Sequence, residues 1–273
     1  MKPVSSFTDS EFLKSKQYKD SSNLSARIAL HRDYGTCTVG VWQWFFDMLL
    51  ATLGSKARIL EVGAGRADLW RENADRIPEG WEITLTDLSD GMLEDGRKQL
   101  GDLADRFEMH PANVQELADA DNTYDAVIAN FMLYHLPDRP KGIAQIRRVL
   151  KPDGVLFACT LGHNHMRQYW ELVRSVVDDP NMALQGQNPF TLNDGAEQLG
   201  GSFDDIVMVR YHCDIKLTDV EPMVAYFHSN GDEAILSGQY DDAVRQRVQK
   251  EIDEKGHFFI QKDTGVFVAR GGA

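Results

Sequence analysis

A glycine-rich turn carries the first residues with clear chemical potential: Gly63, Ala64 and Gly65 follow an apolar run and precede a helix-like segment. Glycines let the backbone turn sharply and approach a ligand closely, and the N-terminus of a following helix presents free N–H groups. Glu61 stands two residues before the first glycine, and Asp87 follows the next apolar run, 24 residues after Gly63. A carboxylate in the place of Asp87 can accept hydrogen bonds from both hydroxyls of a ribose. The spacing therefore predicts a nucleoside-binding site.

The acidic residues discriminate between classes of nucleoside ligand. Asp87 could instead cap a helix, but Ser89 offers a side-chain cap for the helix expected from Gly91, which leaves Asp87 for the ligand. Glu61 would lie beside the part of the ligand that follows the ribose, where it would repel two phosphates and suit an ammonium and a sulfonium. Asp68 also occupies the third glycine position of a dinucleotide-binding G-x-G-x-x-G. An NAD(P)-dependent oxidoreductase and a cofactor-binding subunit without activity of its own stay open as alternatives.

Short apolar runs alternate with amphipathic segments between residues 57 and 160 and define the elements that position these residues. This alternation predicts βαβ units around a parallel sheet. The runs 83–86 and 126–130 lack polar alternation, so we expect helices on both faces of the sheet. Segments 202–217 and 257–270 are predicted to add late strands, one of them antiparallel at an edge. The predicted fold is a doubly wound α/β sheet of about seven mostly parallel strands.

The chain divides into a core and additions that can cover it. Residues 1–40 are predicted to form an N-terminal helical lid, and residues 41–273 a domain with its core at 57–160. Residues 161–273 would add a cap after the fifth strand and complete the sheet. Apolar side chains at helical spacing predict one further helix on the core, through Trp42, Phe45, Phe46, Leu49, Leu50 and Leu53. Gly54 can end that helix in a left-handed conformation.

Five blocks of sequence, in their order and spacing, resemble the class I S-adenosylmethionine-dependent methyltransferases. The blocks are ILEVGAGRADLW, TDLSDGML, MHPANVQEL, YDAVIANFMLYHLPD and IRRVLKPDGVLFACT. The resemblance covers roughly residues 57–160, and the RVLKPDG turn is its most specific part. It implies a Rossmann-like fold, S-adenosylmethionine as the cofactor, and transfer of its methyl group to an oxygen, nitrogen or carbon atom of a small molecule.

The resemblance also implies roles for residues within the blocks. It assigns cofactor contacts to Glu61, Gly63, Ala64, Gly65 and Asn130 at the methionine portion, Asp87 at the ribose, and Leu88, Met92, Asn113 and Val114 at the adenine. Asn113 replaces a frequent aspartate, and its amide oxygen can still accept a hydrogen bond from the adenine amino group. Ala67 occupies the third position of the family's G-x-G-x-G, a small change provided that the backbone there needs no positive φ.

Candidate catalytic residues follow the strands, because ligands lie at the carboxyl ends of strands in open α/β sheets. Tyr134 and His135 come directly after the fourth predicted strand, and His163 follows the fifth. His135 can accept a proton near neutral pH, although a structural histidine before Pro137 would give the same sequence. His163 and His165 lack an assigned carboxylate partner, so we expect no metal site.

The N-terminal segment holds three candidate substrate contacts: Tyr18, His31 and Tyr34. All three are side chains that could line a pocket from a lid. A helix with His31 on its apolar face could instead simply pack on the core.

Composition restricts the partners. Acidic residues outnumber basic ones by 42 to 29, and the formal charge of −13 disfavours nucleic acid, which leaves a small-molecule substrate. No apolar run approaches the roughly 18 to 20 residues of a membrane span. Cys37, Cys159 and Cys213 show no paired spacing, so we expect neither a disulfide framework nor a cysteine zinc site, and a reducing cytoplasm. Composition carries no information about the oligomeric state.

Overall fold

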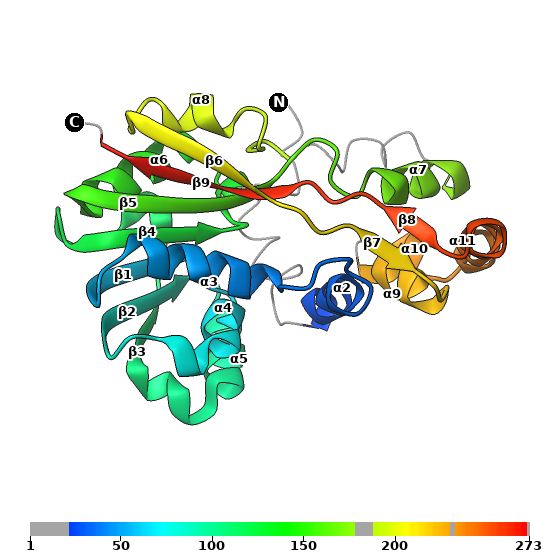
Figure 1. The fold of residues 1–273 in the computed structure, drawn as a ribbon, viewed down its shortest axis with the longest axis horizontal. Helices are drawn as coiled ribbons and strands as arrows, with labels where there is room; N and C mark the ends of the chain where they lie inside the picture. Colours follow the sequence, from blue (N-terminus) through cyan, green and yellow to red (C-terminus); the bar gives the residue numbers. More distant parts are fainter. Residues whose placement is uncertain (1–21, 178–187, 230–232, 272–273) are drawn as a thin grey trace.

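The computed structural model describes residues 22–177, 188–229 and 233–271, which form a large sheet domain and a smaller second lobe (Figure 1). The large sheet has seven strands in the order β3-β2-β1-β4-β5-β9-β6. Their bounds are Lys56–Val62 for β1, Gly80–Asp87 for β2, Phe107–Pro111 for β3, Tyr124–Asn130 for β4, Leu150–Leu161 for β5, Asp205–Tyr211 for β6 and Thr264–Arg270 for β9. Only β9 runs antiparallel to its neighbours, β5 and β6. The predicted fold is therefore confirmed.

Helices cover both faces of the large sheet, as the uniformly apolar strands predicted. One face carries α3 (Val41–Thr52), α4 (Asp68–Glu72) and α5 (Asp90–Leu100), and the other carries α6 (Arg139–Val149) and α8 (Gly195–Leu199). Short 3₁₀ turns complete the connections, as η2 (Ala74–Arg76), η3 (Gly101–Arg106), η4 (Val114–Glu116) and η5 (Leu133–His135). Each face buries its own apolar core, so the sheet is a rigid platform for the loops at its strand ends.

Helix α3 packs on the sheet through the predicted apolar stripe. Phe45 and Phe46 are fully buried, and the Phe45 ring lies 5.9 Å from that of Phe157 in β5. Two details of the prediction were wrong. Leu50 is 37% exposed, and the helix ends through extended backbone at Leu53 (φ −99°, ψ 144°) rather than through a left-handed Gly54. The extended conformation leads the chain directly into β1.

The second lobe consists of five helices and a two-stranded antiparallel sheet within the described residues (Figure 1). Its elements are α2 (Ser22–Asp33), α7 (Arg167–Val176), β7 (Ile215–Leu217), α9 (Glu221–Ser229), α10 (Glu233–Leu236), α11 (Asp241–Lys255) and β8 (Phe258–Ile260). Leu30 of α2, Tyr169 of α7 and Phe227 of α9 are buried together in its core. The N-terminal helix thus belongs to the same packed unit as the C-terminal helices.

The late strands differ from the prediction, because each of the two segments forms two strands. Segment 202–217 divides into β6 and β7, and segment 257–270 divides into β8 and β9. At the division, the Lys262 N–H donates to the Asp214 carboxylate at 2.9 Å, and the Gly162 N–H donates to the Asp263 carbonyl at 2.8 Å. Here hydrogen bonds to a side chain and to a neighbouring loop take the place of backbone pairing between the two segments. The chain segments then leave the large sheet and pair again as β7 and β8 in the second lobe (Figure 1).

Cys37 and Cys213 form a disulfide, which corrects the expectation drawn from their spacing. Their Cα atoms lie 4.9 Å apart although the residues are 176 positions apart in sequence. The bond joins the α2–α3 connection to the β6–β7 connection, where the Tyr211 hydroxyl also donates to the Val39 carbonyl at 2.6 Å. Sequence spacing carries no sign of a contact that only the fold creates. Cys159 is buried and free.

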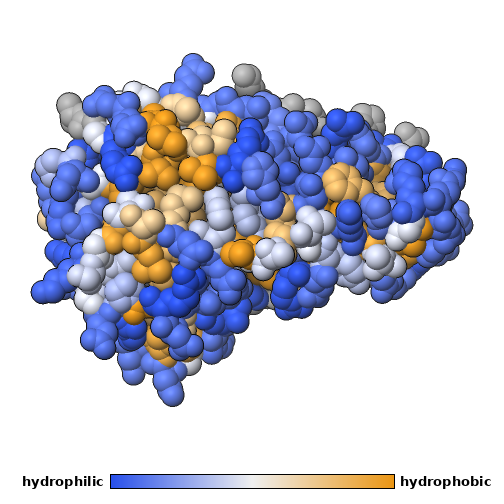
Figure 2. Space-filling model, in the orientation of Figure 1, coloured by the Kyte–Doolittle hydropathy of each residue, from blue (hydrophilic) through white to orange (hydrophobic). Residues whose placement is uncertain are grey.

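Strand β6 is an edge of the large sheet and is less covered than its neighbours. Val207 and Met208 are 51% and 37% exposed. Figure 2 shows an apolar area where β6 and β9 lie. None of the helices in the described part of the chain is long and apolar enough to cross a membrane.

Candidate active site

The glycine-rich turn joins the carboxyl end of β1 to α4. Gly63 and Gly65 have positive φ, at 69° and 57°. A Cβ atom on Gly63 would lie 2.8 Å from the Cβ atom of Met132, so packing and backbone conformation both require glycine there. The Ala64 N–H donates to the Thr86 carbonyl at 2.9 Å. The turn is thereby fixed between β1, β2 and the loop after β4.

Ala67 also has a left-handed backbone, with φ 59° and ψ 31°. The sequence analysis accepted alanine at this position on the condition that the backbone there needs no positive φ. The structure does not meet this condition. A non-glycine residue in this conformation costs roughly 1–2 kcal/mol. Ala67 is 1% exposed and packs in the core beneath α3, and burial of its methyl group offsets about 0.8 kcal/mol of that cost.

Asp87 closes the turn from the end of β2. Its Oδ2 accepts the Gly65 N–H and its Oδ1 accepts the Ser89 N–H, both at 2.9 Å. Burial raises the pKa of Asp87, and these hydrogen bonds lower it in part. Ser89 caps α5 by accepting the Met92 N–H at 3.4 Å, as predicted, but Asp87 is not left free of backbone contacts. Each carboxylate oxygen still has a second lone pair for a ligand.

Glu61 lies at the end of β1 in a buried hydrogen-bond network. Its Oε2 accepts the Trp70 indole N–H at 2.6 Å, and its Oε1 accepts the Asn130 amide N–H at 2.9 Å. Glu61 is 2% exposed, and burial raises its pKa to about 7 against the effect of both hydrogen bonds. The Oδ1 atom of Asn130 is buried and has no hydrogen-bond partner among the described residues. Glu61 and Asn130 therefore offer a ligand acceptor atoms.

Two side chains of this region escaped the sequence analysis. Trp70 donates its indole N–H to Glu61, but a tryptophan in an apolar helix position predicts only a core residue. Phe131 follows Asn130 with φ 53°, an unusual conformation for a bulky residue, and its ring lies 6.0 Å from that of Trp42. No residue pattern reports a left-handed phenylalanine. Such strained backbone is frequent at ligand sites.

The loops after β2 and β3, which hold three of the four predicted adenine contacts, meet at Asp87. The Ala112 N–H donates to the Asp87 carbonyl at 3.0 Å, which joins the end of β3 to the end of β2. Asn113 accepts the Gln115 N–H through its Oδ1 at 3.0 Å, so that oxygen keeps one lone pair. The side chains that the sequence assigned to this place range from half-buried to buried: Leu88, Met92 and Val114.

The three catalytic candidates lie in different surroundings. Tyr134 is buried in the core on the α6 face, and its ring contacts that of His135 at 4.5 Å. His135 is half-buried in η5, directly after β4. His163 is exposed, and its Nε2 lies 3.2 Å from the Thr191 hydroxyl, in the segment before α8. Of the three, His135 is half-buried and follows Asn130 by five residues in the loop after β4.

The predicted substrate contacts from the N-terminal segment lie in the second lobe. The His31 ring lies 6.2 Å from that of His165 and 5.9 Å from that of Tyr226. Tyr34 accepts the Lys216 N–H through its carbonyl at 3.0 Å, and its side chain packs against the core of the lobe. Tyr18 lies outside the described residues. Across the described ranges, no three histidine, cysteine or acidic side chains gather as a metal site would require.

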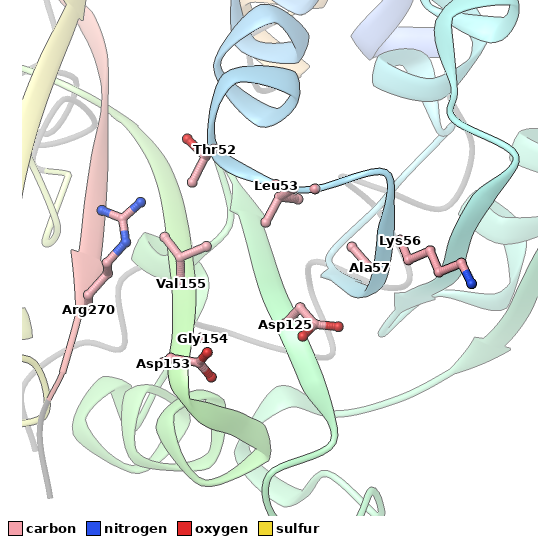
Figure 3. Close-up of a pocket in the computed structure, with 10 residues that line it drawn as sticks. Thr52, Leu53, Lys56, Ala57, Asp125, Asp153, Gly154, Val155 and Arg270 are labelled. Atoms are coloured by element: carbon pink, nitrogen blue, oxygen red, sulfur yellow. The ribbon is translucent and has the colours of Figure 1, made fainter.

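A hollow of about 220 Å³ opens at the opposite edge of the large sheet (Figure 3). Lys56 and Asp125 line it from the amino ends of β1 and β4, and Arg270 from the end of antiparallel β9. Lys151 forms an ion pair with Asp125 at 2.6 Å. Because the glycine turn lies at the carboxyl ends of the same strands, the hollow is separate from the candidate active site.

The chain matches known proteins over the region that carries the turn. Residues 59–154 match the family model described as a methyltransferase domain. The ubiquinone/menaquinone biosynthesis C-methyltransferase UbiE of Chromobacterium violaceum is 34% identical over 119 residues, which are 43% of this chain and 48% of that protein. The chain thus spans about half the length of the curated relatives it matches.

Solved structures share the fold over most of the chain. Phosphoethanolamine N-methyltransferase 2 of Haemonchus contortus, in complex with S-adenosyl-L-methionine, has a TM-score of 0.57 at 18% identity and covers 100% of this chain and 61% of its own. The YcgJ protein of Bacillus subtilis has a TM-score of 0.55 at 12% identity, with 84% and 98% covered. The domain match agrees with the resemblance drawn from the five sequence blocks, and the solved structures share the predicted fold.

Proposed function

We propose that this chain, a class I S-adenosylmethionine-dependent methyltransferase by its domain match and its fold, transfers a methyl group to a small-molecule acceptor. The reaction would take place at the carboxyl ends of β1, β2, β4 and β5. The cofactor supplies an activated methyl group on its sulfonium. The protein must hold the cofactor, orient the acceptor and exclude water.

The pairing of Glu61 with Asn130 is the observation that carries the proposal. The unpartnered Oδ1 of Asn130 is buried, and a buried acceptor without a donor costs about 1–3 kcal/mol. The α-ammonium of the cofactor's methionine portion would supply that donor, and the Glu61 carboxylate would attract its charge. A dinucleotide would instead bring two phosphates to these acceptor atoms. The pair therefore favours S-adenosylmethionine over NAD or NADP.

The rest of the cofactor fits the residues beside the pair. Asp87 would accept hydrogen bonds from the ribose hydroxyls with the lone pairs that Gly65 and Ser89 leave open. Leu88 and Met92 would pack on the adenine, with Asn113 and Val114 at its edge. The glycine at position 63 would let the backbone approach the methionine portion closely.

The acceptor would bind between the loop after β4 and the second lobe. His135 is the candidate base there when the accepting group must lose a proton. Phe131 and Trp42 would form an aromatic wall that excludes water near the methyl group. The predicted lid spans residues 1–40, of which 1–21 lie outside the described residues, and α2, packed in the second lobe, would serve as part of the cover. Relatives named as C- and N-methyltransferases support carbon or nitrogen as the acceptor atom.

Calorimetry on the full chain tests the cofactor site. The wild type should bind S-adenosylmethionine, and Asn130→Ala should weaken this binding by about 10- to 100-fold, because a charge-assisted hydrogen bond is lost. Asn164→Ala, in the exposed loop after β5, is the matched control and should bind normally. A wild type that prefers NAD, or equal binding by both variants, would contradict the proposal. Formation of S-adenosylhomocysteine in an acceptor screen then reports turnover.

A further inference from the structure

We propose that the junction of the two lobes holds a binding site for an anionic group of the methyl acceptor, a carboxylate or a phosphate, with Lys262 as its cation and His165 as its hydrogen-bond donor. The inference rests on the proposed function, because it concerns the acceptor of that methyl transfer. It depends on the loop after β5 and on the loop between β8 and β9.

These two loops lie side by side at the carboxyl edge of the large sheet. Leu161, at the end of β5, pairs with Thr264, at the start of β9. The Gly162 N–H donates to the Asp263 carbonyl at 2.8 Å, and the Met166 N–H donates to the Gln261 carbonyl at 2.9 Å. The contacts are so close that a Cβ atom on Gly162 would collide with the Asp263 carboxylate. The positions of His165 and Lys262 are therefore fixed relative to each other.

His165 is a neutral donor in this place. Its Nδ1 accepts the Asp263 N–H at 3.2 Å, and the Thr264 hydroxyl lies 3.5 Å from the same atom. Because Nδ1 is the acceptor, the ring proton belongs on Nε2. Burial, aided by the charge of Lys262, lowers the pKa of His165 to about 3. The Nε2–H group can thus donate to an anion without bringing a charge of its own.

Lys262 is a cation with little compensation. Burial lowers its pKa to about 8, and the charge of Asp214 offsets this only in part. In the portions of the chain that the structure describes, no carboxylate oxygen lies within ion-pair distance of its Nζ, which instead lies 5.7 Å from the centre of the Tyr211 ring. The neighbouring Asp263 carboxylate pairs with Arg210. In a chain with a formal charge of −13, a half-buried lysine without a carboxylate partner favours an anionic ligand.

The site lies at a suitable distance from the methyl-transfer end of the cofactor site. Asn130 pairs with Cys159 of β5, and β5 pairs in turn with β9. Two strand spacings, a lateral distance of about 10 Å, separate Asn130 from Val266 of β9, and Lys262 lies four residues before Val266, about 13 Å along an extended chain. The two backbone positions are thus about 16 Å apart, and an extended acceptor together with the length of the lysine side chain can cover this distance, with the reactive atom near Asn130 and the anionic group at Lys262. An acceptor that lacks the anion would leave the lysine without a partner.

Binding of inorganic anions to the full chain tests the site without knowledge of the acceptor. Sodium phosphate and sodium acetate are titrated at pH 7 and constant ionic strength, with thermal unfolding as the readout. The wild type should show a saturable rise in Tm, and the stronger of the two anions identifies the group. Lys262→Met should weaken the apparent affinity at least tenfold, whereas Lys262→Arg should retain it within about threefold. Lys216→Met, an exposed lysine of β7, is the matched control and should behave as the wild type.

The outcomes separate this inference from the proposed function, because S-adenosylmethionine binding is measured on the same proteins by calorimetry. A wild type that binds the cofactor but shows no saturable anion response would overturn the anion site alone. Equal responses in Lys262→Met and Lys216→Met would overturn it as well. A wild type that binds no S-adenosylmethionine would contradict the proposed function itself.

Discussion

Replacement of Glu61 by glutamine should make the unfolding free energy less dependent on pH. The wild-type carboxyl is 2% exposed and has its pKa raised to about 7 from 4.5, chiefly by burial. Between these two values the folded chain holds a proton on Glu61 that the unfolded chain has released. The free energy of unfolding is therefore highest at low pH with respect to this group. It falls as the pH rises from about 4.5 to 7, and the contribution of Glu61 stays constant above pH 7.

The size of this effect follows from the pKa shift. At 1.36 kcal/mol for each pKa unit, the carboxyl costs the folded state about 1 kcal/mol at pH 5 and about 3 kcal/mol at pH 8. A glutamine side chain does not ionise, so it does not carry this pH-dependent cost, and it can keep both hydrogen bonds. Its Oε1 can accept the Trp70 N–H, and its Nε2 can donate to Asn130 Oδ1 once that carboxamide turns over.

Urea unfolding of Glu61→Gln and wild type at pH 5, 6, 7 and 8 measures the difference. The variant should gain stability relative to the wild type as the pH rises, by about 2 kcal/mol across this range, at equal m-values. Glu82→Gln on neighbouring β2 is the control, because this exposed acid pairs with Arg58 at the surface and should show almost no trend. A constant difference between Glu61→Gln and wild type from pH 5 to 8 would refute the reasoning.

Three further predictions concern the ribose, the base and the disulfide. Asp87→Ala should weaken S-adenosylmethionine binding by about 10- to 100-fold in calorimetry, since a charge-assisted acceptor is lost, and unchanged affinity in a folded variant would remove Asp87 from the site. His135→Ala should lower kcat by about 10² to 10⁴ with cofactor affinity retained, and a loss below tenfold would make His135 structural. Cys37→Ser should lower the unfolding free energy by about 2–5 kcal/mol in urea, because the disulfide closes a loop across 176 positions, and equal stability would mean that the bond adds nothing.

The glycine-rich turn and the strands around it could be predicted from the sequence because their determinants are local. A buried strand, two glycines and a helix follow one another directly in the sequence. The residue type and spacing of Gly63 and Gly65 alone therefore predict the turn. Asp87 ends the next strand and needs only a parallel neighbour to reach Gly65. The left-handed Ala67 lies beyond such reasoning, because the surrounding packing and not the residue type imposes its conformation.

The second lobe could not be predicted because its contacts are distant in sequence. Segment 202–217 has the composition of one strand, and only the hydrogen bond from Lys262 to Asp214 reveals why it divides. Cys37 meets Cys213 only after α2 packs with the C-terminal helices. The partners of His165 likewise come from Asp263 and Thr264, nearly a hundred residues away. Contacts of this kind are set by the fold as a whole.

The paired crossings between β6 and β7 and between β8 and β9 have a mechanical consequence. These two adjacent connections, residues 212–214 and 261–263, are joined by the hydrogen bond from Lys262 to Asp214 and resist rotation of one lobe against the other. The disulfide adds a covalent link between the β6–β7 connection and the α2–α3 connection. These contacts oppose torsion more than bending, so we expect a tilt of the second lobe to be the easier relative movement. Entry of acceptor and exit of product would then require the second lobe to tilt rather than to twist.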